Sequence, residues 1–374
     1  MKQETRSIII VTTLIITISV SIKVYGSEPD RTQSANEAKI AQLIDILGMP
    51  QSEEETRKAE LNKAIADLSA IGDSVIKPVM DRIQQNDNAL LALLQHRTVQ
   101  VLKAIATTKA QQALLDIALK KDSHWAAINY IETLNNKSDA RKLLVSKNPD
   151  ILFSALHAMR GIELDKELLK KLQLLAQSLD AKVRIQAAGV MGADPTEKYA
   201  AEKVDALMGS IKTAEKVKDG HKKLPNPQAI GTVSDDVYFQ IIDALTKAKG
   251  IDKHLKYKTN SLDGKTRYCV IIAQANRGDS SVKQDLYKII NDPNAGLLKC
   301  GAVIAFNYIG ASDDLPFLHK IALTDTLAIE PPQRSFGSHD PLQTAIQNNK
   351  FYPVRFWARQ AIQWIEKKTK SKTN

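Results

Sequence analysis

Apolar residues recur at helical spacing through most of this chain, in short segments separated by polar turns. The pattern is clearest over residues 180–192, where Val183, Ala187, Ala188 and Met191 fall on one helical face. The segments form pairs that return about every thirty residues, a period typical of stacked supersecondary units. The first helix of five pairs ends at a glycine: Gly161, Gly192, Gly250, Gly278 and Gly310. The sequence therefore predicts an array of stacked helix pairs.

Cap and turn residues place the predicted helices. A capping box from Ser34 to Glu37 starts a helix that ends at Leu47, and a second helix runs from Ser52 to Ile71. Further pairs are expected at 95–106 with 111–120, 124–134 with 139–145, and 151–160 with 166–177. After the 180–192 helix, Asp194 and Pro195 are expected to open its partner, because proline at a first helical position loses no hydrogen bond.

Composition favours an all-α fold, since aromatic residues make up only 5% of the chain while Ala, Leu and Ile are plentiful. We expect a polar linker at 27–33, a single solenoid over 34–370 and a short tail at 371–374. Two stretches rich in Pro and Gly interrupt the period, at 212–233 and 324–352. Each follows the second helix of its pair, so both inserted loops are expected on one edge of the array.

A specific resemblance appears in the segment Asp180-x-x-Val183-Arg184-x-x-Ala187-Ala188, which ends at Gly192. It resembles the first helix of a HEAT repeat, and weaker matches occur at 266–278, 297–315 and 354–362. The resemblance implies a right-handed α-solenoid of HEAT-like helix pairs with a curved binding surface. The family is defined by its shape, so the resemblance supplies no catalytic residues.

The N-terminus predicts export. Lys2 and Arg6 precede an apolar stretch from Ile8 to Ile22, and small residues near Gly26 suit a signal-peptidase site. As a helix this stretch rises only about 22 Å, short of the ~30 Å hydrocarbon core of a bilayer. A signal peptide over 1–26, cleaved to release a periplasmic or extracellular protein, is therefore expected. A retained N-terminal anchor, with the protein facing outside the cytoplasm, is the alternative.

The net charge of +10 is concentrated in one segment, 246–267. Its basic residues, which are candidates for binding an anion or an acidic partner, are Lys247, Lys249, Lys253, Lys256, Lys258, Lys265 and Arg267. Such a patch attracts polyanions. The export signal argues against nucleic acid, which leaves an anionic polymer, lipid head groups or an acidic protein; a solvated, lysine-rich surface is an equally simple explanation.

Candidate chemistry is sparse. Cys269 and Cys300 lie about one repeat apart, so they either form a disulfide in an oxidising compartment or remain buried thiols. The histidines show no metal-ligand spacing and no glycine-rich phosphate loop occurs, so we expect neither a metal nor a cofactor. Ser338, His339 and Asp340 are adjacent in one loop, unlike the separated residues of a catalytic triad.

These features favour an exported, non-catalytic scaffold that binds a protein partner through the concave surface of the array. Binding of an anionic polymer or lipid head groups through 246–267 is a second hypothesis. The third is a HEAT-like lyase or other enzyme, for which Cys269, Cys300 and His339 are the only plausible reactive groups. The sequence does not identify the partner or the oligomeric state.

Overall fold

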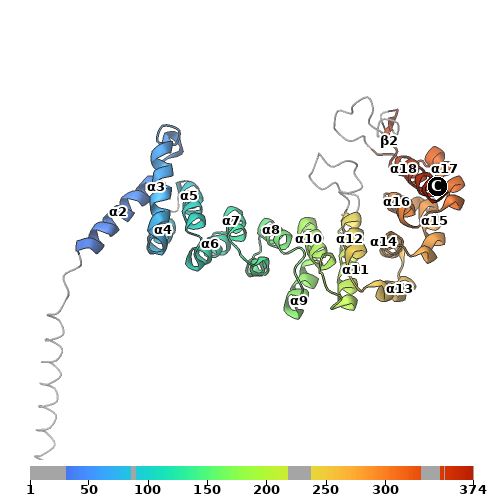
Figure 1. Cartoon of the computed structure of the whole chain (residues 1–374), viewed down its shortest axis with the longest axis horizontal. Helices are drawn as coiled ribbons and strands as arrows, with labels where there is room; N and C mark the ends of the chain where they lie inside the picture. The colour runs from blue at the N-terminus through green and yellow to red at the C-terminus, as the bar shows by residue number, and fades with distance from the viewer. Residues whose placement is uncertain (1–30, 86–89, 218–236, 330–345, 349, 374) are drawn as a thin grey trace, which may run out of the picture. The chain divides into compact units, whose positions relative to one another are not determined.

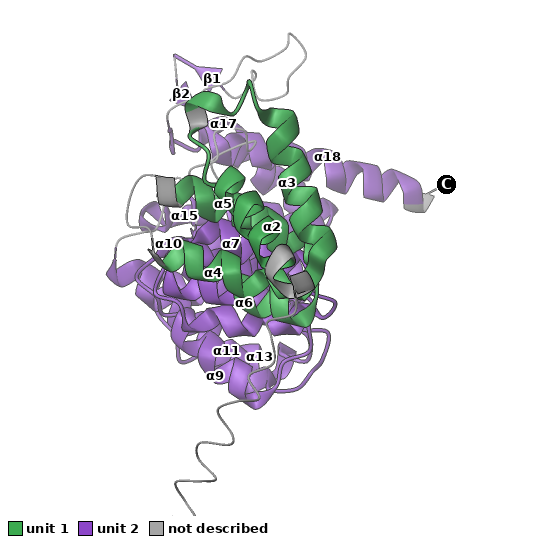
Figure 2. Cartoon of the chain, turned by 90° about the vertical axis from the view of Figure 1, so that its left-hand side faces the viewer, with its two compact units in different colours: residues 1–114 green, residues 115–374 purple. Residues whose placement is uncertain are grey.

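The computed structural model describes residues 31–85, 90–217, 237–329, 346–348 and 350–373. The chain divides into two compact units, residues 1–114 and 115–374, shown in green and purple in Figure 2. The predicted signal peptide, His339 and most of both predicted insertions lie outside the described residues. Among the described residues, no helix is both long enough and apolar enough to cross a bilayer.

Unit 1 consists of helices (Figure 1). The elements are α2 (Arg31–Leu47), η1 (Gln51–Glu53), α3 (Lys58–Ile71), η2 (Gly72–Val75), α4 (Ile76–Gln85), α5 (Leu90–Ile105) and α6 (Thr108–Lys120), within which the unit boundary falls. α3 packs against both α2 and α5, and α4 packs against α5. Arg97 of α5 is buried and donates from Nη1 to the carbonyls of Leu47 and Met49, which satisfies backbone acceptors at the end of α2.

Unit 2 is also helical, apart from one small hairpin. Its elements are α7 (His124–Glu132), η3 (Lys137–Val145), α8 (Pro149–Ala158), α9 (Lys166–Leu175), α10 (Ala181–Gly192), α11 (Ala200–Lys216), α12 (Val237–Lys247), α13 (Asp252–Thr259), α14 (Gly264–Asn276), η4 (Ser280–Val282), α15 (Lys283–Asn291), η5 (Pro293–Ala295), α16 (Leu298–Ile309), η6 (Ser312–Asp314), α17 (Leu315–Thr324), β1 (Ile346–Gln347), β2 (Lys350–Phe351) and α18 (Pro353–Thr373). The two strands pair antiparallel.

The helices of unit 2 form two rows. In the even row, formed by α8, α10, α12, α14, α16 and α18, each helix packs against its even-numbered neighbours. In the odd row, α9, α11, α13, α15 and α17 each pack against the even helix that follows, as η3 packs against α8. This all-α, repeat-like stacking of neighbours is compatible with a solenoid.

α10 explains why the even row is close-packed. Nearly all of its side chains are buried, because α8, α9, α11 and α12 all contact it. Asp180 caps the helix by accepting a hydrogen bond from the Val183 backbone N–H. Gly192 lies so close to α12 that a Cβ built on it would be 2.6 Å from Ala244 Cα. The small residues at the end of α10 therefore allow the close approach of α12.

Polar contacts between side chains and their partners also recur at sequence separations close to the repeat of about thirty residues. Ser210 donates to the carbonyl of Ala176, Arg277 pairs with Asp252 and Lys283 pairs with Asp314, over sequence separations of 34, 25 and 31 residues. Each joins one helix pair to the next. Contacts at this separation are what an array stabilised by neighbouring repeats requires.

Both predicted insertions have different bounds in the structure. The start at 212 was wrong, because α11 continues to Lys216 with Ala214 buried on the same face as Ile211. The second insertion is not entirely loop: Phe351 in β2 is buried against Phe356 and pairs with Ile329. Both ranges follow odd-row helices, α11 and α17.

Several helix ends also differ from the prediction. α2 is already helical at Arg31, so the predicted linker at 27–33 extends too far, and α18 continues through 371–373 of the predicted tail. α3 begins at Lys58 rather than Ser52. α11 begins at Ala200 rather than Pro195, because Asp194 is buried in the turn and binds side chains there instead of capping a helix.

Candidate partner-binding surface

The basic segment 246–267 extends from the end of α12, through α13, to the start of α14, and most of its charges have partners. Lys247 pairs with Asp243, Lys256 with Asp279, Lys258 with Asp205 and Arg267 with Asp285, at N–O distances of 2.6, 3.1, 2.8 and 3.5 Å respectively. Lys265 Nζ lies 5.4 Å from the centroid of the Tyr238 ring. Of the seven candidate cations, Lys249, Lys253 and Lys265 form no ion pair in the part of the chain described.

All four acidic partners lie outside the segment, and three of them, Asp205, Asp279 and Asp285, lie beyond α12, α13 and α14. The concentration of lysines along the sequence is therefore not matched by an equal concentration of unpaired charge in space. Neighbouring helices supply carboxylates, which reduce the field that a polyanion would experience. The structure gives this hypothesis less support than the sequence does.

The two cysteines lie on α14 and α16, which pack against each other. Both are thiols in the structure and both are fully buried. A buried thiol does not meet a substrate, so this placement disfavours Cys269 and Cys300 as nucleophiles. Their disulfide in an oxidising compartment stays a prediction. Among the described residues, no group of His, Cys, Asp and Glu side chains has the geometry to hold a metal ion.

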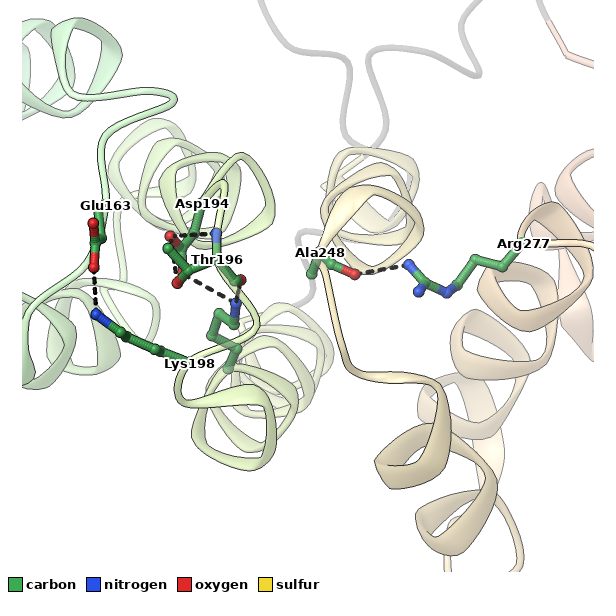
Figure 3. A network of polar contacts seen from close by, with 7 residues as sticks. Glu163, Asp194, Thr196, Lys198, Ala248 and Arg277 are labelled. Carbon is green, nitrogen blue, oxygen red and sulfur yellow. Dashed lines mark hydrogen bonds and ion pairs between the residues drawn. The ribbon is translucent and has the colours of Figure 1, made fainter.

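Ion pairs and hydrogen bonds connect the turns at which even helices pass to odd ones (Figure 3). Lys198 pairs with exposed Glu163 at 2.5 Å, whereas Lys203 and Asp194, 3.0 Å apart, are both fully buried. Thr196 donates its backbone N–H and its hydroxyl to Asp194. These polar groups pair with one another rather than pointing toward a ligand. We therefore infer that the contacts at these turns stabilise the fold.

Arg277 is the corresponding contact between the α12–α13 turn and the end of α14. Its Nη1 donates to the carbonyls of Thr246 and Ala248 at 2.7 and 2.8 Å. Its Nε and Nη2 donate to the two carboxylate oxygens of Asp252 at 2.6 and 2.7 Å. The hydrogen bond from Arg277 holds the pKa of Asp252 below its usual value. The guanidinium thereby satisfies helix-terminal carbonyls that α12 leaves free.

This pKa shift predicts acid sensitivity. A carboxyl whose pKa is depressed by folding stabilises the protein above its unfolded pKa, near 4, and that stabilisation is lost as the pH falls through the folded pKa. We expect the urea midpoint of unfolding to be flat between about pH 5 and 8 and to fall below about pH 4. Between about pH 5 and 3 the urea midpoint of the Asp252→Asn variant should fall less than that of the wild type. An equal fall in both proteins would show that the Asp252–Arg277 pair does not contribute to the acid sensitivity.

The opposite edge, where odd-row elements end and even helices begin, carries exposed apolar side chains. We call this the return edge and its apolar side chains the return-edge row: Trp125, Val145, Leu174, Leu179, Tyr257 and Leu323. The last five are 69–80% exposed and Trp125 is 43% exposed. Val145, Leu174, Tyr257 and Leu323 lie in the last turn of an odd-row element and Leu179 lies just beyond one. Trp125 lies at the start of α7, which follows α6 and packs against α8.

Two open hollows lie beside this row. One of about 600 Å³ is next to Val145 and is formed by the α6–α7 and η3–α8 connections. The other, of about 410 Å³, separates α9 from α11 and includes Leu174, Lys170 and Asp205. In unit 1, a hollow of about 950 Å³ between α2 and α4 has a charged rim that includes Asp45 and Arg82, which pair with each other. All are open depressions rather than enclosed cavities.

The return-edge row is not evident from the sequence pattern. Leu174 and Tyr257 each lie within a helical segment, where one apolar residue more or less does not alter the pattern. The available signal was positional: apolar residues beside the turns that follow odd-row elements. The chain matches no protein-family model, and a comparison with curated proteins finds no significant match. The assignment therefore rests on geometry.

Proposed function

We propose that this chain is a non-catalytic, right-handed HEAT-like solenoid that is exported and binds an extended segment of a protein partner. The observation that carries the proposal is the return-edge row. Large apolar side chains that remain more than two-thirds exposed are unfavourable in water, and contiguous exposed apolar surface marks interaction sites. We place the main contact there rather than over the whole concave surface expected from the sequence.

The spacing of the row supports an extended occupant. Neighbouring helices pack about 8–10 Å apart, and an extended chain advances about 3.3 Å per residue. Successive return-edge positions would therefore meet about every third residue of a partner segment. Trp125, Val145 and Leu179 belong to three successive return-edge connections, and Val145 and Leu174 line the two hollows. A small ligand would need one enclosed pocket instead.

A peptide-display selection with the full chain tests the proposal. We expect enriched peptides with apolar residues separated by about three positions, as the helix and strand spacings require. The triple variant Val145→Gln, Leu174→Gln, Leu179→Gln should weaken binding of these peptides at least about tenfold. These side chains are mostly exposed, so the variant should unfold within about 0.5 kcal/mol of wild type.

The matched control replaces exposed apolar residues outside the row, Ile71→Gln with Tyr308→Gln. It should bind the enriched peptides as the wild type does. Enriched peptides that bind the triple variant with unchanged affinity would overturn the assignment to the return edge. Failure to enrich any peptide would count against partner binding by this route.

A further inference from the structure

The last helix extends beyond the helices that support it. Ile365 is the last buried residue of α18, and residues 366–371 are all exposed. Figure 2 shows the end of α18 projecting away from the rest of unit 2. A terminal helix that only closed the array would end where its buried face ends, so the extension needs a separate explanation.

The extension is basic. Lys367, Lys368 and Lys370 are exposed along it, and Lys372 follows in the sequence, against the single acid Glu366. In the described part of the chain, neither Lys367 nor Lys368 forms an ion pair. This contrasts with the 246–267 segment, where four of the seven cations pair with carboxylates.

Two exposed aromatic residues lie on the adjacent helices α16 and α18. Trp364 is 53% exposed and precedes Lys367 and Lys368 by three and four positions, so the three share one face of α18. On α16, Tyr308 is 54% exposed, and its neighbour Gly310 is so close to Ile365 that a Cβ would lie 2.6 Å from Ile365 Cδ1. Packing against the array, which explains half-buried Trp357 beside Phe356, leaves half of Trp364 in water.

We propose that this basic aromatic end, formed by Tyr308, Trp364, Lys367, Lys368 and Lys370, binds the surface of an anionic lipid bilayer. Amphipathic Trp and Tyr rings favour the bilayer interface, and lysines beside them are attracted to anionic head groups. Asp313 and Glu366 are the nearby acidic residues, and they leave the end with a net positive charge. The aromatic rings favour a bilayer over a soluble polyanion, because a polyanion needs only the lysines.

Vesicle sedimentation with the full chain tests this proposal. The wild type should bind vesicles that contain roughly 30–40 mol% phosphatidylglycerol more strongly than it binds pure phosphatidylcholine vesicles. Its binding to the anionic vesicles should be stronger at low than at high ionic strength. The variant Lys367→Gln, Lys368→Gln, Lys370→Gln should lose about fivefold in partition coefficient per lysine. Trp364→Ala should weaken vesicle binding while leaving retention on heparin, a soluble polyanion, unchanged.

The matched control removes the same charge elsewhere, through Lys247→Gln, Lys249→Gln, Lys253→Gln, and should bind vesicles nearly as the wild type does. Circular dichroism confirms that each variant is folded. Equal binding to neutral and anionic vesicles, or equal losses in the two triple variants, would overturn the proposal. Loss of heparin and vesicle binding together in the α18 lysine variant, with no effect of Trp364→Ala, would instead indicate a polyanion site.

Discussion

Replacing Lys203 by methionine is expected to lower the free energy of unfolding by about 3–5 kcal/mol, the usual cost of breaking a buried ion pair from one side. Lys203 and Asp194 are both fully buried. Lys203 Nζ lies 3.0 Å from Asp194 Oδ2 and donates to the Thr196 carbonyl at 2.9 Å. Without the ammonium, the carboxylate stays buried with only the hydrogen bonds from Thr196 to stabilise it. Urea unfolding at pH 7, followed by circular dichroism, measures the loss.

Lys198→Met is the matched control. Lys198 precedes Lys203 by only a few residues and pairs with Glu163, but both of these side chains are more than half exposed. Exposed pairs contribute about 0–1 kcal/mol, so this variant should unfold almost as the wild type does. The double variant Asp194→Asn, Lys203→Met should recover part of the loss, because it removes the unpaired charge. Equal effects of Lys198→Met and Lys203→Met would show that burial does not govern these pairs.

Gly192→Ala is expected to destabilise the protein by about 1–3 kcal/mol, the typical cost of overpacking, although alanine is the better helix former. The added Cβ would lie 2.6 Å from Ala244 Cα and 2.7 Å from its carbonyl oxygen. Both atoms belong to the α12 backbone, so relief requires α10 and α12 to separate. The change in urea midpoint relative to wild type is the measurement.

Gly189→Ala, in the same helix, is the comparison. A Cβ at Gly189 would meet only the end of the Arg160 side chain, which can move. This variant should be neutral, or more stable by up to about 1 kcal/mol through helix propensity. If both substitutions had the same effect, close packing of α10 on α12 would not be what requires Gly192.

The sequence predicts the helices of unit 2 well where periodicity and caps agree. α8, α9 and α10 begin within a few residues of their predicted starts, and in the structure Asp165 and Asp180 cap α9 and α10. The 139–145 segment forms the 3₁₀ helix η3, which apolar spacing alone cannot distinguish from an α-helix over so few residues. The predicted helix start at Pro195 was wrong, because Asp194 forms a buried ion pair with Lys203 instead of capping a helix at that position.

In unit 1 the prediction was less complete. The pattern did not predict α4, although Val79 and Ile83 are buried one turn apart, because Pro78 lies inside the helix and indicates a break.

The candidate site was harder to predict from the sequence than the helices were. The charge of a sequence segment does not reveal acids such as Asp205 and Asp285 that other helices bring to it. An exposed leucine looks like a core leucine until its neighbours are known.

Contacts between neighbouring helices hold unit 2 together. Hydrogen exchange of the Lys203→Met variant, measured by mass spectrometry, tests whether its stability is local. Protection should fall in α10, α11 and α12, next to the broken pair, while peptides from α16, α17 and α18 keep wild-type protection, because stability in such an array is largely local. An equal loss of protection across residues 115–374 would contradict the account, since it would show one cooperative core.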